Sequence, residues 1–297
     1  MFPSSSQRRY WMFPDHQSVV AKRVEANEHF KERNKESGST FLSADEELTL
    51  CNWYTNKLIE MTGQFRPPPP ASVLGTAVTY LKRFYLNNSV MDHHPKDIML
   101  ACLYMACKVE EYNVTIEQFV CILPVSERQT AAEYVLRNEL MLLQALCFHL
   151  TVHNPYRPLE GFLIDMKTRS HISVTQIESL RASTELFLQH SLFSDASLLF
   201  APSQIILAAL LHSASSANTD LNSYLSTLFH GSGKEEFLHD KVKTIQRMVT
   251  SSVRTSEQEA VRIQEKLKAC QNPELNPDSQ QYRERAEQYE MESSEEL

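Results

Sequence analysis

The amino-acid sequence predicts an all-helical protein built from two tandem repeats of five helices, with an extra helix at each end and a short acidic tail. Helix-start signals recur along the chain, and no convincing run shows the apolar–polar alternation of a strand. Residues 98–107 are ten consecutive apolar residues, too few to cross a membrane and typical of a helix that other helices surround. A similar pattern returns 107 residues later, which indicates a duplication.

The first predicted helix lies in an N-terminal extension, residues 1–43. Asp15 is placed to cap a helix that runs to about Lys35, with Val20 and Val24 on one face and many charged residues on the other. Because an isolated helix of this length is marginal in water, we expect it to pack against the rest of the protein.

The first repeat is predicted to span residues 44–152. Its first helix starts at a capping-box pattern formed by Ser43 and Glu46. A rigid proline run, 67–70, separates this helix from a second one over about Ser72 to Leu86. The apolar stripe predicted for the first of these helices comprises Leu48, Cys51, Tyr54, Leu58 and Met61.

The remaining helices of the first repeat follow in order. Pro95 stands where the first turn of the central apolar helix accepts proline. Thr115 and Gln118 start a short helix, and a last helix covers residues 131–146. The linker at residues 153–158, His-Asn-Pro-Tyr-Arg-Pro, ends the unit.

The second repeat is predicted for residues 153–254 and shows the same kinds of signal. Its helices are expected over residues 161–167, after a capping box formed by Thr175 and Glu178, from about Pro202, and over residues 240–253.

The chain is expected to end in one more helix, residues 255–271, followed by a disordered acidic tail, residues 272–297. Ser256 and Glu259 form the capping-box pattern of this helix. Its predicted apolar stripe contains Val261 and Leu267.

Composition and charge limit the function classes. The tail holds eight acidic and two basic side chains, so it accounts for most of the net charge of −8 and leaves the folded part almost neutral. A nucleic-acid groove needs clustered Lys and Arg and is therefore not expected. The six cysteines form no C-x-x-C pair, and no signal peptide or membrane span is recognisable, so we expect an intracellular protein with buried free thiols.

The internal repeat is clearest in the central helices. Pro95–Leu103 and Pro202–Leu210 share a proline, an isoleucine, an alanine and two leucines at a constant offset of 107 residues. The same offset pairs Leu81 with Leu188 in the preceding helix. Each unit is therefore predicted to wrap about five helices around one buried helix.

Two charged residues set the first repeat apart. Lys108 ends its central helix, where the second repeat has Ser215, and Glu139 lies on its last helix, where the counterpart is Gln246. The residues three and four positions from Glu139 are all apolar, namely Val135, Leu136, Leu142 and Leu143. One interpretation is an internal salt bridge, or side chains that reach solvent. The other is a donor and an acceptor offered to a partner protein at the rim of an apolar patch.

The sequence around these two residues resembles the cyclin family. Residues 100–111, which end in Ala-Cys-Lys-Val-Glu-Glu, are similar to the central helix of the cyclin box. Arg137-Asn138-Glu139, with the leucines that follow and Phe148, is similar to its fifth helix. Three longer strings, at residues 6–11, 82–91 and 154–165, resemble the H-type branch of the family. The resemblance covers nearly the whole chain and implies two tandem cyclin folds.

The resemblance also implies a function. A cyclin is a regulatory subunit, not an enzyme, and it binds and activates a cyclin-dependent kinase. The kinase-binding residues implied here are Lys108, Val109, Glu139, Leu143 and Phe148. For the H-type branch the implied partners are the catalytic subunit of the CDK-activating kinase, the RING-finger assembly factor ménage à trois, and the transcription factor TFIIH. The implied targets are the activation loops of other cyclin-dependent kinases and the C-terminal repeats of RNA polymerase II.

The tail bears on location and modification. It lacks the Lys/Arg cluster of longer H-type chains, so the nuclear location that the resemblance implies is expected to depend on import with partners. Ser293 and Ser294 precede two glutamates and are suited to phosphorylation by an acidophilic kinase. No cofactor, membrane or direct nucleic-acid contact is expected.

Other functions are less well supported. A C-type cyclin, which serves a different transcriptional kinase, is the nearest alternative. A TFIIB-like DNA-binding factor shares the duplicated fold but needs a basic face and a zinc ribbon, which the sequence lacks. No G-x-x-x-x-G-K, H-E-x-x-H or G-x-S-x-G motif indicates catalysis. The histidine pairs 93–94 and 149/153 lie at helix ends, and we expect no metal there.

Overall fold

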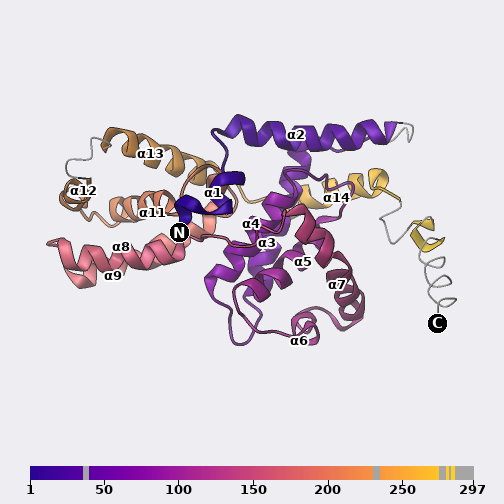
Figure 1. The fold of residues 1–297 in the computed structure, drawn as a ribbon, viewed down its shortest axis with the longest axis horizontal. Helices are drawn as coiled ribbons and strands as arrows, with labels where there is room; N and C mark the ends of the chain where they lie inside the picture. The colour runs from indigo at the N-terminus through magenta and orange to yellow at the C-terminus, as the bar shows by residue number, and fades with distance from the viewer. Residues whose placement is uncertain (36–39, 230–234, 274–278, 281, 285–297) are drawn as a thin grey trace.

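The computed structural model describes residues 1–35, 40–229, 235–273, 279–280 and 282–284, and every regular element within these residues is a helix. Figure 1 shows two helical bundles beside each other, with the N-terminal helix α2 lying along one side of the first bundle. The all-helical, two-repeat fold class predicted from the sequence is confirmed.

The two bundles have matching sets of helices. The first consists of α3 (Ala44–Thr62), α4 (Ala71–Phe84), α5 (Pro95–Val109), α6 (Ile116–Val120) and α7 (Arg128–Ala145). The second consists of α8 (Tyr156–Arg169), α9 (Val174–Ser191), α11 (Pro202–Ser216), α12 (Asn222–Phe229) and α13 (Glu235–Ser251), with the short α10 (Ala196–Leu199) before α11. Outside the bundles lie α1 (Ser6–Tyr10), α2 (His16–Arg33) and α14 (Glu257–Cys270). Single 3-10 turns occur at Phe2–Ser4 and Val125–Glu127.

The offset found in the sequence is kept in the backbone. Helices α5 and α11 are both fifteen residues long, and both have proline in the first turn. Just beyond their ends, Glu111 (φ 58°) and Asn218 (φ 50°) both adopt the left-handed conformation, again 107 residues apart. The two copies therefore end their central helices in the same way.

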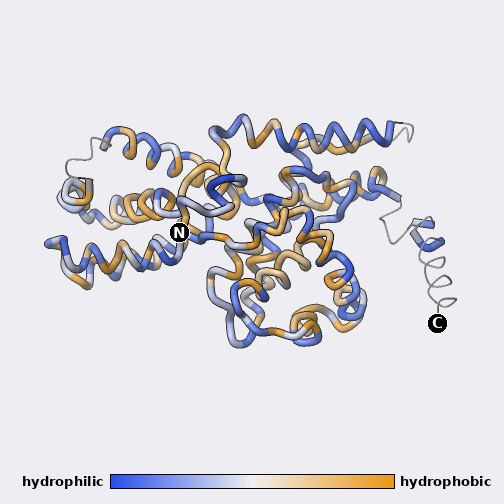
Figure 2. Tube along the Cα trace, viewed as in Figure 1, coloured by the Kyte–Doolittle hydropathy of each residue, from blue (hydrophilic) through white to orange (hydrophobic). Residues whose placement is uncertain are grey.

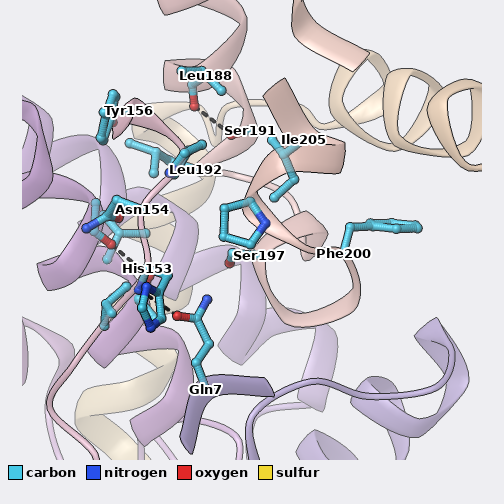
Figure 3. A pocket seen from close by; sticks show the side chains of 16 residues that line it. Gln7, His153, Asn154, Tyr156, Leu188, Ser191, Leu192, Ser197, Phe200 and Ile205 are labelled. Atoms are coloured by element: carbon cyan, nitrogen blue, oxygen red, sulfur yellow. Dashed lines mark hydrogen bonds between the residues drawn. The ribbon is translucent and has the colours of Figure 1, made fainter. Parts of the chain in front are cut away.

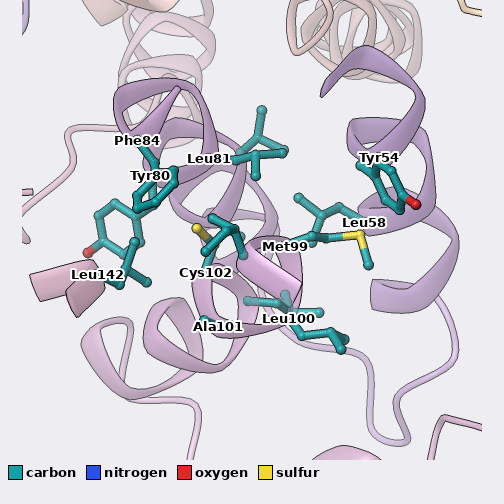
Figure 4. Packing of buried hydrophobic residues seen from close by; sticks show 14 of the residues in the cluster. Tyr54, Leu58, Tyr80, Leu81, Phe84, Met99, Leu100, Ala101, Cys102 and Leu142 are labelled. Atoms are coloured by element: carbon teal, nitrogen blue, oxygen red, sulfur yellow. The ribbon is translucent and has the colours of Figure 1, made fainter. Parts of the chain in front are cut away.

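The central helix of each bundle is enclosed on all sides. The ten-residue apolar run of α5 is buried without exception. Figure 4 shows Met99 and Cys102 of α5 among Leu58 of α3, Leu81 of α4 and Leu142 of α7. Figure 2 shows α11 of the second bundle as largely hydrophobic, whereas α2 carries many hydrophilic residues. Burial of this much apolar surface is the main force that stabilises each repeat.

Helix α2 does not use the face predicted for it. Asp15 caps the helix as predicted and accepts a hydrogen bond from the backbone N–H of Ser18 at 2.8 Å. Val20, however, is exposed, so the predicted stripe of Val20 and Val24 is wrong. The buried face comprises Val19, Arg23, Ala26, Asn27 and Phe30. The sequence pattern does not reveal this face, because Arg23 and Asn27 are polar and their hydrogen-bond partners belong to other elements.

Most predicted helix starts are confirmed, and several in the second repeat are wrong. Helix α8 starts at Tyr156, inside the predicted linker, not at residue 161, and α13 starts at Glu235, not at residue 240. The capping boxes begin at Ser43 and Thr115 as predicted. In the second repeat the capping box is formed by Ser173 and Gln176, not by Thr175 and Glu178. Ser173 has the same three-residue spacing to an amide side chain, and it lies at the true end of the preceding loop.

The cysteines lie in two kinds of environment. All six cysteines are free, and Cys102, Cys107 and Cys270 are buried as predicted. Cys121 and Cys147 are exposed, because they lie where α6 and α7 end and the chain leaves the core.

Among the described residues, no helix combines the length and apolar character needed to span a membrane.

The C-terminal helix packs on the first repeat, although it follows the second in the chain. Its buried residues are Ala260, Ile263, Leu267 and Cys270, of which the last three join the core of the first repeat. Leu267 is therefore confirmed as part of the apolar stripe, whereas Val261 is 46% exposed and is wrong. Lys266 pairs with Glu46 of α3 at 2.6 Å.

The segment between the repeats is pinned to α4. Asn154 donates hydrogen bonds to the backbone oxygen of Ser72 (3.2 Å) and the hydroxyl of Thr76 (2.8 Å). This approach requires Gly75, because a Cβ there would lie 2.3 Å from the Asn154 side-chain oxygen. The backbone N–H of His153 donates to the side chain of Gln7 from α1, at the edge of a cavity of about 30 Å³ between the repeats (Figure 3).

A buried ion pair joins α2 to the second repeat. Arg23 donates two hydrogen bonds to Asp195, at 2.8 and 2.6 Å, and both residues are less than a tenth exposed. Burial acts to raise the pKa of Asp195, but the hydrogen bonds and charge of Arg23 outweigh it and lower the pKa. Helix α2 is thereby connected to the loop that precedes α10.

We expect Asp195→Ala to destabilise the protein by about 3–5 kcal/mol, because it leaves the Arg23 guanidinium buried without its carboxylate. The double variant Arg23→Met with Asp195→Leu should recover part of the loss, because it removes the Arg23 charge together with its partner, whereas the nearby Lys82 still loses the attraction of Asp195. Urea unfolding followed by circular dichroism measures both. Lys22→Ala, which removes an exposed pair with Glu25, is the control and should leave the midpoint unchanged. Equal losses in the control and in Asp195→Ala would contradict the importance of burial.

A second buried carboxylate gives a pH dependence. Glu47 of α3 accepts hydrogen bonds from Ser89 (2.5 Å) and from Asn27 of α2 (3.0 Å). Burial nevertheless raises its pKa from 4.5 to about 7. Because the folded pKa lies above the unfolded one, the stabilising contribution is complete below about pH 4.5 and is lost as the pH rises through about 7.

We therefore expect Glu47→Gln to flatten the dependence of stability on pH. Between about pH 4.5 and 7, wild type should lose up to about 3 kcal/mol more than the variant, because the amide does not ionise. Thermal unfolding at several pH values measures the difference between the two curves. Parallel curves for the two proteins would show that Glu47 does not titrate in this range.

Candidate functional site

The two charged residues singled out in the sequence lie next to each other. Lys108 is in the last turn of α5, and Glu139 is on α7. The Lys108 Nζ lies 2.5 Å from the Glu139 Oε1, and 4.7 Å from the ring centre of Tyr104 one turn earlier. The first repeat thus carries an ion pair at the junction of its central and last helices.

This ion pair lies at the surface. The side chain of Lys108 is 41% exposed and that of Glu139 is 27% exposed. Glu139 has apolar neighbours on α7, but it is not buried among them, because α7 turns only part of that apolar stripe toward the core. An ion pair this accessible contributes little to folding, typically 0–1 kcal/mol. Both charged groups can be reached by a partner.

Exposed apolar side chains lie close to the ion pair on the same helix. Leu136 (52% exposed) and Leu140 (60%) are one turn apart on α7 and flank Glu139 in the sequence. Phe148, 62% exposed, follows the end of the helix, where its backbone N–H donates to the oxygen of Leu143 at 2.9 Å. We call Leu136, Leu140 and Phe148 the apolar edge of α7. Apolar groups next to oriented polar groups are typical of protein interfaces.

The second repeat lacks these features at the matching positions. Its counterparts of Leu136, Leu140 and Phe148, 107 residues later, are Lys243, Arg247 and Thr255. The buried positions of α7 and α13 still correspond: Val135 and Leu142 match Val242 and Val249, and all four are buried.

The counterparts of the ion pair also differ. Ser215 is exposed, and the Gln246 side chain donates to the backbone oxygen of Ala208 at 3.0 Å. The two repeats therefore keep the same core and differ in this surface.

The structure places the predicted site residues in different settings. Lys108 and Glu139 are in contact, and Phe148 is exposed at the end of α7. Val109 and Leu143 are half-buried against the first core and offer less surface. Sequence reasoning took Leu136 only as an apolar neighbour of Glu139 and did not consider Leu140. The sequence does contain a signal for these two residues, because the second repeat has polar residues, Lys243 and Arg247, at the matching positions. Ser293 and Ser294 lie outside the described residues.

The histidines considered in the sequence have other partners in the structure. Among the described residues, no group of three or more His, Cys, Asp or Glu is arranged to hold an ion. His94 caps α5 by accepting from the backbone N–H of Lys96, and His149 accepts from Trp11. These histidines have structural partners.

Comparison with known proteins agrees with the division into two repeats. Residues 26–151 match the cyclin N-terminal domain, and residues 154–271 match the cyclin C-terminal domain. Cyclin-H of Xenopus laevis is 40% identical over 287 residues, which cover 93% of this chain and 88% of that protein. The chain belongs to the cyclin family.

Solved structures share this cyclin fold. A chain in the CAK complex from Chaetomium thermophilum bound to ATP-gamma-S superposes with a TM-score of 0.85 at 24% identity, covering 98% of this chain and 94% of that one. A chain of the yeast TFIIK complex gives 0.68 at 27% identity, covering 83% and 99%. The similarity is to H-type cyclins, and the C-type and TFIIB-like alternatives are not favoured.

Proposed function

We propose that this cyclin is the regulatory subunit of a cyclin-dependent kinase of the CDK-activating type, and that it has no catalytic activity of its own. It binds the kinase through the first repeat. Acting with TFIIH, it supports phosphorylation of CDK activation loops and of the C-terminal repeats of RNA polymerase II. The similarity to cyclin-H over almost the full chain supports the choice of kinase.

One observation supports a kinase-binding site on the first repeat. The exposed Lys108–Glu139 pair and the apolar edge of α7 occur in the first repeat, and polar residues replace them at the matching positions of the second. Lys108 supplies donors and Glu139 supplies acceptors to a partner backbone, while the apolar edge supplies the surface that is removed from water.

The mechanism follows from kinase chemistry. A protein kinase aligns ATP only when a strand lysine pairs with the glutamate of its mobile C-helix. A cyclin that binds the helix-in state more tightly than the helix-out state shifts the kinase toward the active form by that difference in affinity. A surface that bound both states equally would not shift the kinase toward the active form, however tight the binding.

Further partners and the location belong to the same proposal. The ménage à trois assembly factor completes the complex, which works in the nucleus. Within this proposal the protein enters the nucleus together with its partners. Phosphorylation of Ser293 and Ser294 is testable by phosphate mapping.

Reconstitution tests the proposed function. The purified chain, mixed with the isolated catalytic subunit of the CDK-activating kinase, should form a stable complex and raise phosphorylation of an RNA polymerase II repeat peptide. Pull-down from nuclear extract with mass spectrometry identifies the kinase independently. Capture of a different transcriptional kinase would favour the C-type alternative.

We expect Lys108→Ala and Glu139→Ala each to weaken kinase binding by about 30-fold to several-thousand-fold, because each leaves a charge-assisted contact unmade in the complex. Each variant should melt within a few degrees of wild type, since the pair is exposed. Calorimetric titration and thermal unfolding measure the two effects. Ser215→Ala and Gln246→Ala are the matched controls and should bind normally. A large loss of melting temperature with unchanged affinity would instead assign the pair a purely structural role.

We expect Leu140→Arg to lower kinase affinity at least about ten-fold, because it places an unpaired charge within an apolar contact. The substitution gives the first repeat the residue that the second carries at Arg247. The reciprocal control, Arg247→Leu, should change neither affinity nor activation. If the control weakened binding and Leu140→Arg did not, the second repeat would be the binding unit.

A further inference from the structure

The turn after α7 has an unusual backbone. Cys147 (φ 51°) and Phe148 (φ 57°) are consecutive non-glycine residues in the left-handed region. Each such residue typically costs about 1–2 kcal/mol and persists where its surroundings hold it. Among the described residues, the second repeat has no left-handed pair at the matching positions 254 and 255. The strain is therefore a property of the first repeat.

The next residue, His149, is held by three groups. Its backbone oxygen accepts a hydrogen bond from Arg83 of α4 at 3.0 Å. Its Nδ1 accepts from the indole N–H of Trp11 at 3.1 Å. Its ring stacks on Tyr10, with the ring centres 4.8 Å apart and the planes 7° from parallel. Two of the three groups come from the N-terminal segment, more than 130 residues earlier in the chain.

Trp11 also covers a buried charge. Arg83 is 1% exposed, and burial lowers its pKa to about 10. Two of its nitrogens, Nε and Nη2, have no hydrogen-bond partner among the residues that the structure describes. Its guanidinium carbon lies 5.0 Å from the centre of the Trp11 ring, so the indole face compensates in part for the lost water. Trp11, itself 6% exposed, therefore links α4 to the strained turn.

The strained turn presents one exposed side chain. Phe148 is 62% exposed, while His149 behind it is held by Trp11 and Arg83. The N–H of Phe148 is bonded to the backbone of Leu143, so the direction of the Phe148 side chain depends on the conformation of this turn. The turn is also bonded to α7 through the backbone N–H groups of Cys147, Phe148 and His149, so the contacts of His149 with Trp11 and Arg83 add a second restraint on the segment that carries Phe148.

We propose that Trp11 and His149 are positioning residues for the kinase-binding surface: by clamping the turn after α7, they hold Phe148 in the orientation that contacts the kinase. This inference rests on the proposed function. It gives the N-terminal segment a role in recognition through Phe148, without contact between Trp11 and the kinase. Holding Phe148 in place before binding lowers the conformational entropy that this side chain loses when the kinase binds.

A double-mutant cycle on the full-length chain tests the clamp. Trp11→Phe keeps a ring over Arg83 but removes the indole N–H that holds His149. We expect it to weaken affinity for the isolated kinase catalytic subunit about three- to thirty-fold, within the range of coupled residues. In the Phe148→Ala background the same substitution should change affinity less than about two-fold, because no side chain remains to be positioned.

Substitutions of His149 provide a second test of the clamp. His149→Leu should match Trp11→Phe, whereas His149→Asn keeps an acceptor near the Nδ1 position and should restore much of the affinity. Equal effects of Trp11→Phe in both backgrounds, or no effect in wild type, would overturn the clamp. Failure of wild type itself to bind the kinase would overturn the proposed function instead. Circular dichroism of each variant checks that the chain is folded.

Discussion

The enclosure of one apolar helix in each repeat is the constraint on which the remaining structure depends. Because α5 is buried along its whole apolar run, it has no face for polar residues, and its charged residues are confined to the two ends. Lys108 emerges at the C-terminal end, where the helix dipole favours a positive charge. Helix α7 packs beside α5, which brings Glu139 to the same place. The candidate site is thus a consequence of how the core is closed.

Two ion pairs differ in burial, and this difference decides how much each contributes to the stability of the fold. Arg23 and Asp195 are almost fully buried, form two hydrogen bonds and connect α2 to the second repeat. Removal of one partner leaves a charge that has no water to stabilise it. Lys108 and Glu139 lie at the surface, and solvent compensates for the loss of either one. The same chemistry therefore stabilises the fold in one place, and in the other leaves two charged groups accessible at the surface.

The termini both support the first repeat, which carries the candidate site. Helix α14 completes its core from the far end of the chain. The N-terminal segment contacts the first repeat through Trp11, the segment between the repeats through Gln7, and the second repeat through Arg23. The second repeat retains the core pattern but has charged residues where the first has Leu136 and Leu140. The two copies share the same core pattern, while their surfaces differ at these positions.

Patterns along the chain were enough to predict the helical class, the duplication, most helix starts, and the two charged residues, Lys108 and Glu139, that distinguish the first repeat. These features depend on local spacing and on the total apolar content of a helix, both of which can be read along the chain. Only the tertiary structure decided which face α2 buries, that Val261 points outward, that Leu140 is exposed, and that Trp11 holds His149. Such outcomes depend on partners far away in sequence: a polar residue such as Arg23 can be buried only if Asp195 is there to meet it, and no local pattern records that partner.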